Sequence, residues 1–194
     1  MNKTILKVSS VAIFLILISS YVGTNAYAVW GHGVAHGPSF GHVYDNTYTD
    51  GLKIDGKTFD ISKFHQSIPT QTLYVNVPST IALKMFHTDG AQSIRHVALY
   101  ITNSSAPEVY SKGEWIAYDS GVGLTTNDPN KIFKSVTVNV SSQGHFLYLT
   151  FKIIPQASMD TSNILIKSWD YRFTSIQSTV TGALQIIKWQ SSLT

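Results

Sequence analysis

The sequence contains no cysteine. This absence excludes disulfide bonds, thiolate catalysis, zinc sites with cysteine ligands and type 1 copper sites, which need a cysteine sulfur. Charged residues are also few, at 13% of the chain, whereas aromatic residues reach 12%. A chain this poor in charge and rich in Tyr, Phe and Trp is typical of pleated, half-buried β-structure rather than of a helical or disordered protein.

The N-terminal apolar run is too short to span a bilayer as a helix. Val11–Ile18 supplies about eight apolar residues, and a spanning helix needs about 20. Lys3 and Lys7 precede the run, and Ala26-Tyr27-Ala28 follows it as a small-x-small cleavage site. The pattern predicts a secretory signal peptide over residues 1–28, and hence an extracytoplasmic protein, secreted or on the cell surface. If the run is retained, the protein is instead anchored to the membrane, as an accessory subunit of a membrane complex.

Basic residues are scattered singly. The chain has 14 Lys and Arg against 11 Asp and Glu, and two of the lysines leave with the signal, so the mature protein is nearly neutral. A surface that follows phosphates needs clustered Lys and Arg, so we expect no nucleic-acid partner. The acidic residues are dispersed, and no nucleophile elbow, phosphate loop or dinucleotide fingerprint is present. We therefore predict no catalytic residues and a protein that is not an enzyme.

Short runs of alternating apolar and polar residues dominate the chain from Leu73 onward, separated by Gly, Pro, Asn, Asp and Ser. This pattern predicts an all-β domain over residues 51–194, a single antiparallel two-sheet sandwich that is immunoglobulin-like or cupredoxin-like. A Gly/His-rich leader over residues 29–50 joins it to the signal peptide. The expected strands are Thr72–Val77, Ile81–His87, His96–Thr102, Trp115–Tyr118, Phe133–Val140, His145–Ile154, Ile164–Trp169 and Ala183–Trp189.

Two hairpins stand out. Phe133–Val140 and His145–Ile154 alternate in hydropathy on either side of Ser141–Gly144, which predicts an antiparallel pair with one face toward the core. Lys53–Phe59 predicts a shorter hairpin around Asp55-Gly56. The residues that follow, Asp60–Phe64, fit one helical turn.

Three of the seven histidines lie close together in the leader, at His32, His36 and His42, with glycines around each. Neutral imidazoles on so permissive a backbone can converge on Cu(II), Zn(II) or Ni(II). The spacing is not a closed zinc signature, because no cysteine accompanies it. The alternative is a polar leader whose histidines are merely solvated.

Two further histidines bracket a turn. His87 ends one expected strand and His96 opens the next, so both imidazoles are expected at one end of the sandwich. The passage from Phe86-His87-Thr88-Asp89-Gly90 to His96-Val97-Ala98-Leu99 resembles the cupredoxin segment that delivers the first copper ligand. That resemblance places His96 at the first-ligand position. The family's later Cys-His-Met cluster has no counterpart, so the resemblance implies the scaffold without its type 1 site.

The overall layout, a signal followed at once by a His-Gly segment and a cysteine-free β domain, resembles exported proteins of ammonia-oxidising archaea. It is similar in layout to the B subunit of archaeal ammonia monooxygenase, a cupredoxin-like domain behind a histidine-containing start. The chain departs from that subunit in two ways: histidine is not first after Ala28, and there is no His-x-His pair. The resemblance implies contact with copper outside the cytoplasm but transfers no ligand.

These observations lead to two functional hypotheses. The first is a non-enzymatic exported sandwich that captures a transition-metal ion, copper above all, through clustered histidines. Its ligands are drawn from His32, His36, His42, His87 and His96. The second is a structural or adhesive module that contacts another envelope protein or a glycan through aromatic side chains, for which the candidates are Trp115, Tyr118, Phe146 and Tyr148.

Overall fold

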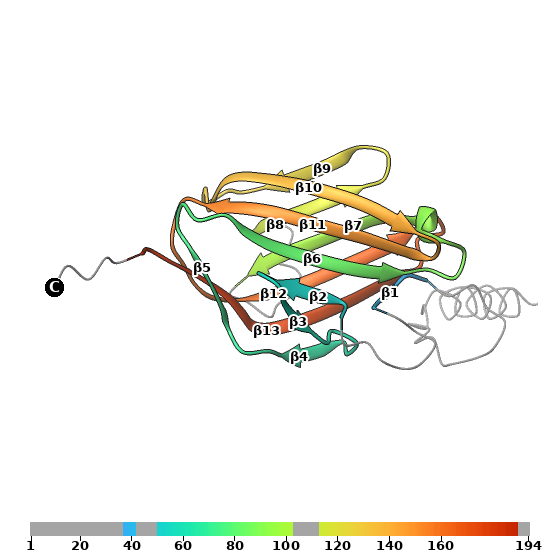
Figure 1. Cartoon of the computed structure of the whole chain (residues 1–194), viewed down its shortest axis with the longest axis horizontal. Helices are drawn as coiled ribbons and strands as arrows, with labels where there is room; N and C mark the ends of the chain where they lie inside the picture. The colour runs from blue at the N-terminus through green and yellow to red at the C-terminus, as the bar shows by residue number, and fades with distance from the viewer. Residues whose placement is uncertain (1–36, 42–49, 103–112, 190–194) are drawn as a thin grey trace, which may run out of the picture. The chain divides into compact units, whose positions relative to one another are not determined.

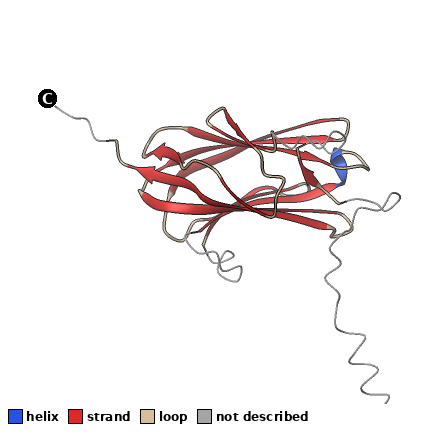
Figure 2. Cartoon of the chain, turned by 90° about the horizontal axis from the view of Figure 1, so that it is seen from below, coloured by secondary structure: helices blue, strands red, loops and turns tan. Residues whose placement is uncertain are grey.

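The computed structural model describes residues 37–41, 50–102 and 113–189. The expected signal peptide lies outside these residues, as do the leader histidines His32, His36 and His42. The described chain forms two β-sheets packed face to face, so the expected all-β two-sheet sandwich is confirmed (Figure 1; Figure 2).

We refer to the six-stranded sheet as sheet I and to the seven-stranded sheet as sheet II. In sheet I the order is β10 (Phe133–Gln143), β11 (Phe146–Pro155), β6 (Ser79–Phe86), β2 (Leu52–Ile54) and β3 (Lys57–Phe59), and β1 (Ser39–Phe40) also pairs with β6. In sheet II the order is β4 (His65–Ser67), β13 (Ser175–Ile187), β12 (Met159–Asp170), β7 (Ile94–Thr102), β8 (Glu114–Asp119) and β9 (Gly123–Asn127), and β5 (Gln71–Tyr74) also pairs with β13.

Sheet I is antiparallel throughout, whereas sheet II is mixed. The short strands β4 and β5 run parallel to β13, which the expectation of a purely antiparallel sandwich did not include. Helix is limited, in the described residues, to a single 3₁₀ turn at Ala91–Ser93 between β6 and β7. Within that same part of the chain, no helix has the length and apolarity needed to cross a membrane.

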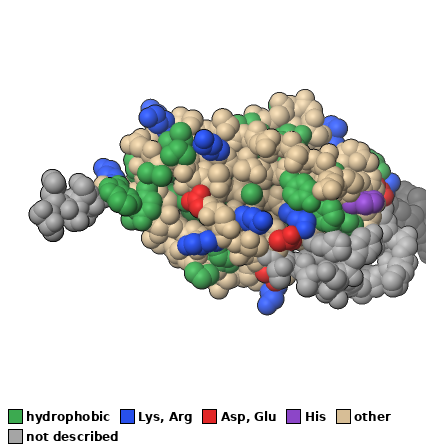
Figure 3. Space-filling view, in the orientation of Figure 1, with side chains coloured by type: hydrophobic (Ala, Val, Ile, Leu, Met, Phe, Trp, Pro, Cys, Tyr) green, Lys and Arg blue, Asp and Glu red, His purple; other side chains and the backbone are tan. Residues whose placement is uncertain are grey.

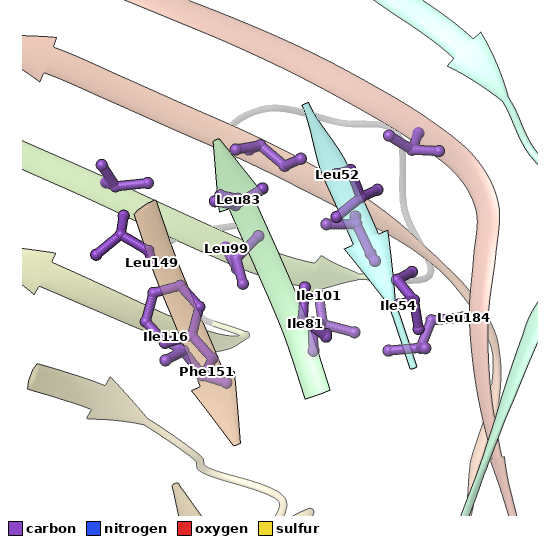
Figure 4. Packing of buried hydrophobic residues seen from close by; sticks show 14 of the residues in the cluster. Leu52, Ile54, Ile81, Leu83, Leu99, Ile101, Ile116, Leu149, Phe151 and Leu184 are labelled. Carbon is purple, nitrogen blue, oxygen red and sulfur yellow. The ribbon is translucent and has the colours of Figure 1, made fainter. Parts of the chain in front are cut away.

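The core lies between the sheets because each long strand alternates its side chains. On sheet I, Leu149 pairs with Leu83 and both point inward. On sheet II, Leu99 pairs with Ile116 and both point toward sheet I. Figure 4 shows these side chains meeting in one apolar layer. Alternation at period two therefore places one face of each strand in the core.

Both expected hairpins are confirmed. β10 and β11 pair from Gln143↔Phe146 onward, and Gly144 takes a positive φ of 57° in the two-residue turn. The β2–β3 turn carries positive φ at both central residues, 46° for Asp55 and 82° for Gly56. Positive φ at both positions is the type I′ geometry that matches the twist of the flanking strands.

Three local features differ from expectation. Residues Asp60–Phe64 form no helical turn; instead the Asp60 carboxylate accepts a hydrogen bond from the Ser62 N–H at 2.8 Å, which holds an Asx turn. β1 lies inside the segment expected to be a leader, and its Phe40 is 2% exposed in the core. β12 and β13 begin earlier than expected, because their polar first halves pair through the backbone, which the hydropathy pattern does not register.

Candidate functional site

His87 lies directly after β6 and is fully buried. Its Nδ1 accepts the Asp89 N–H at 3.0 Å, so the ring proton lies on Nε2, which faces Asp170 Oδ2 at 3.2 Å. This bond joins sheet I to the end of β12 in sheet II. Both ring nitrogens are occupied, so His87 is a structural tie between the sheets rather than a free ligand.

Asp170 is the other half of this tie. The side chain is buried, and its Oδ1 accepts the backbone N–H groups of Arg172 at 2.8 Å and Thr174 at 2.9 Å. With His87 on Oδ2, the carboxylate receives three hydrogen bonds. Asp170 thereby fixes the turn between β12 and β13, because a buried carboxylate is stable only when its oxygens are satisfied.

His96 lies on β7 with its side chain on the outer face of sheet II. Its ring stacks on that of Trp169, with 3.5 Å between centroids and 11° between planes. Nδ1 lies 2.7 Å from Asp119 Oδ1. Nε2 is buried and has no hydrogen-bond partner among the described residues. His96 therefore has the same type of carboxylate partner as His87 but keeps one ring nitrogen unsatisfied.

Burial lowers the pKa of His96 below its ordinary value of 6.5, against the opposing effect of the Asp119 carboxylate. Lys167, on the neighbouring strand, also lowers it. The imidazole is thus held in its neutral form. A neutral ring that bonds Asp119 through Nδ1 leaves an unprotonated Nε2 lone pair inside the protein.

Arg95, next to His96, is placed by a β-bulge. The pairing of β7 with β12 passes from Ile94↔Asp170 to His96↔Trp169, so Arg95 is an extra residue opposite no partner. Its carbonyl accepts the Ser120 N–H at 2.9 Å, which ties the β8–β9 turn beside it. The side chain is exposed and makes no ion pair within the described residues. Bulges of this kind re-aim side chains next to binding sites.

A pocket of about 380 Å³, which we call the end pocket, opens beside this arginine. Its lining residues are Arg95, Asp119, Ser120, Gly121, Val122, Trp169, Asp170, Tyr171 and Phe173. Three apolar side chains protrude at its rim, with exposed fractions of 75% for Val122, 48% for Tyr171 and 82% for Phe173. The pocket therefore combines an unpaired cation, a carboxylate and an exposed apolar rim.

Phe173 also has an unusual backbone. Its φ is +62°, a conformation that bulky residues rarely adopt. The surrounding hydrogen bonds impose it: the Phe173 N–H donates to Asp170 O and the Asp170 N–H donates to Thr174 O, both at 3.1 Å. Because the Phe173 ring is mostly exposed to water, its packing does not offset the strain of the backbone. Strain of this kind is common at binding sites, so we regard this turn as a candidate binding element.

Two histidines of the proposed copper site, His87 and His96, lie within the described residues. His87 and His96 bind different carboxylates, and no three His, Asp or Glu side chains in residues 37–41, 50–102 and 113–189 gather as a metal site. Of these two, only His96 has a ring nitrogen without a partner.

Neither Asp–His pair forms a Ser-His-Asp triad. Both nitrogens of His87 are occupied, and Nε2 of His96 meets no hydroxyl in the part of the chain that is described. A nucleophile needs that imidazole nitrogen as its base. The two pairs therefore lack the third group that acyl transfer requires.

The aromatic residues proposed for adhesion are not the exposed ones. Tyr118 is half-buried and packs against the core. Phe146 is half-buried, with Lys84 Nζ 4.8 Å from its ring centroid, and Tyr148 and Trp115 are also half-buried. The rim of the end pocket is exposed instead. On the face drawn in Figure 3, Lys and Arg are scattered rather than gathered into a stripe.

A second and more open pocket, of about 970 Å³, lies where β13 ends, and Tyr74 and Trp189 meet beside it with ring centroids 5.0 Å apart. The last residue of its lining is Trp189, where the described part of the chain ends. None of its lining residues has a positive φ, whereas the lining of the end pocket includes the strained Phe173. The end pocket is the better candidate site.

Fold and site together define the class of this protein as a two-sheet β-sandwich with a pocket at one end. No protein-family model matches the sequence, and no curated protein is significantly similar to it.

The sequence pattern pointed to His96 but not to its neighbours in space. Asp119 and Trp169 meet His96 only through the registers of β7 with β8 and with β12. A local signal did exist for the Asp170 turn, because Asp followed by a polar and aromatic run is typical of an Asx turn after a strand.

Proposed function

We propose that this protein is a non-catalytic recognition module that binds another protein of the cell envelope through the end pocket. The single observation that carries this proposal is the exposed apolar rim around an arginine that forms no ion pair with any described residue. The location follows from the signal peptide that the sequence predicts.

The chemistry of the rim favours a protein partner over a glycan. Val122 offers only an aliphatic surface, which suits an apolar side chain better than a sugar hydroxyl. Tyr, Trp and Arg are the residues that carry most of the binding energy in protein interfaces. A pocket of about 380 Å³ has room for a large side chain. The partner we expect presents an apolar side chain next to a carboxylate, the latter to pair with Arg95.

The proposal is tested by selection from a random peptide library displayed on phage, with the parent protein as bait. We expect the selected peptides to share an acidic residue beside a large apolar one. An Arg95→Glu variant should bind them at least about tenfold more weakly, because the charge across the pocket is reversed.

Phe64→Ser is the matched control, since Phe64 is 55% exposed but does not line the pocket. It should bind the peptides as the parent does. Peptides that lack an acidic residue, or that bind Arg95→Glu as tightly as the parent, would contradict the proposal.

Copper capture by the leader is the second candidate, favoured by the attachment of the leader to this end of the sandwich. A Cβ on Gly37 would lie 2.5 Å from Thr174 Cγ2, so Gly37 packs against the β12–β13 turn. The Gly41 N–H donates to Lys84 O at 2.8 Å. His36 and His42 are covalent neighbours of these two glycines.

Calorimetric titration with Cu(II) separates the two candidates. Capture predicts binding tighter than about micromolar by the mature protein, lost in the variant with His32, His36 and His42 all changed to Ala. His96→Ala should weaken binding if His96 is a ligand, whereas His65→Ala, on β4, should not. Equal binding by the parent and the triple variant would remove this candidate and leave the recognition module untouched.

A further inference from the structure

β10 is a long edge strand of sheet I, with a single paired neighbour among the described strands. It has 11 residues, pairs with β11 on one side, and is the last strand in the order of that sheet (Figure 1). Its polar side chains at Ser135, Thr137, Asn139 and Ser141 are exposed. The valines between them, Val136, Val138 and Val140, pack against the core.

The register shows which backbone groups of β10 face outward. Gln143 and Phe146 close a two-residue hairpin and therefore exchange hydrogen bonds, and alternate pairs along an antiparallel ladder do the same. The N–H and C=O groups of odd-numbered residues from Ser135 to Gln143 thus point to β11. Those of Val136, Val138, Val140 and Ser142 point away from it, as an unfilled template for another strand.

This edge lacks the usual defences against strand addition. Natural edges are blunted by charge, proline, bulges or shortness. β10 contains one charged residue, Lys134, no proline, and one irregularity at its first residues. The other edge strands of the described sheets, β3, β4, β5 and β9, have three to five residues each.

We propose that β10 pairs with β10 of a second copy of this chain, antiparallel and around a two-fold axis at Val138. Sheet I then continues across the dimer. Because the two-fold symmetry is closed, the β10 edge is paired in both copies and no edge remains there for a third chain.

The sequence of β10 is complementary to itself in this arrangement. A two-fold at Val138 sets Val136 opposite Val140 of the other copy, and Ser135 opposite Ser141. Lys134 falls opposite Ser142, so no like charges meet across the interface. β10 alternates in hydropathy, and its one charge, Lys134, meets no like charge in this register, so we expect the edge to pair with its own copy more readily than with an unrelated strand.

The first test is the mass in solution by light scattering on a sizing column at about 100 µM. The parent should have twice the mass of one chain. Val138→Pro should be a monomer, because it removes the N–H that would be donated at the two-fold but not one that β11 uses. Val138→Ala is the control: it loses core packing but keeps the N–H, and it should remain a dimer.

Charge placement tests the register. Ser135→Lys with Ser141→Lys sets like charges opposite each other twice in the dimer and should weaken association at least about tenfold. Ser135→Glu with Ser141→Lys changes the same positions to opposite charges and should remain a dimer. Circular dichroism shows whether each variant is folded.

Two results would overturn the proposal. The first is a parent protein that remains monomeric at the highest concentration. This result would overturn the proposal whether hydrogen exchange finds the outward amides of β10 unprotected or protected by another segment of the same chain. The second is a dimer that both Val138→Pro and the double-lysine variant leave unchanged, since its interface must then lie elsewhere.

Discussion

Two Asp–His pairs stand at one end of this sandwich and differ in how completely they are satisfied. The side chains of His87 and Asp170 are 1% and 3% exposed, and both nitrogens of His87 are bonded. Those of His96 and Asp119 are 10% and 33% exposed, and one nitrogen of His96 has no partner in the described structure. The same two residue types thus form a buried, fully bonded tie in one place and a partly exposed, incompletely bonded pair in the other.

The difference follows from where the backbone places each pair. His87 is clamped between the sheets, where every unsatisfied polar group lowers stability. His96 lies on an outer face, beneath Trp169 and beside a bulge that turns Arg95 outward. Incomplete satisfaction is tolerated at that position, which is where binding sites in proteins commonly occur.

Replacing His87 by phenylalanine should have the largest effect on stability. His87→Phe removes a donor to a buried carboxylate and an acceptor for the Asp89 N–H, so we expect the free energy of unfolding to fall by about 3 kcal/mol. Urea denaturation followed by circular dichroism measures it. Asp170→Asn should also be destabilising, since its amide would set a donor against His87 Nε2–H. A loss below about 1 kcal/mol in both variants would refute the structural role.

A substitution in the strained turn at Phe173 should raise the free energy of unfolding rather than lower it. Asn tolerates positive φ better than Phe, and the Phe173 ring is 82% exposed, so Phe173→Asn should raise the free energy of unfolding by about 1 kcal/mol. The same variant should lose affinity for peptides selected against the end pocket. A variant that is less stable than the parent would show that the ring supports the fold.

His96→Phe should change stability least, by less than about 1 kcal/mol at pH 7. It keeps a ring on Trp169 and removes the unsatisfied nitrogen, while Asp119 is exposed enough to be solvated. The comparison is made by the same urea titration as for His87→Phe. Equal losses at the two positions would erase the distinction between the pairs.

The pH dependence of stability should also distinguish the parent from His96→Phe. Because burial lowers the pKa of folded His96 below 6.5, the unfolded chain binds a proton that the folded chain does not. The free energy of unfolding therefore falls as the pH drops below 6.5. His96→Phe lacks this effect, so its stability relative to the parent should rise as the pH is lowered from 7 to 5. Parallel pH curves for the two proteins would contradict the lowered pKa.

The sequence was sufficient to predict the sandwich and both hairpins, because alternation at period two and the Asp55-Gly56 and Gly144 turns are local signals. It did not predict β4, β9 or the first halves of β12 and β13, because most of their side chains are polar and the apolar alternation is weak there. The site could not be predicted without the pairing register of the strands. Asp119 and Trp169 are far from His96 in sequence, and the bulge at Arg95 is visible only once β7 and β12 are paired.

The most direct test of the central claim is photo-crosslinking in the cell envelope from a benzoyl-phenylalanine placed at position 173. The account predicts one crosslinked partner, lost when Arg95→Glu is added and absent when the probe is placed at the exposed Phe64. Crosslinking that Arg95→Glu leaves unchanged, or equal labelling from positions 173 and 64, would contradict the end pocket as the binding site.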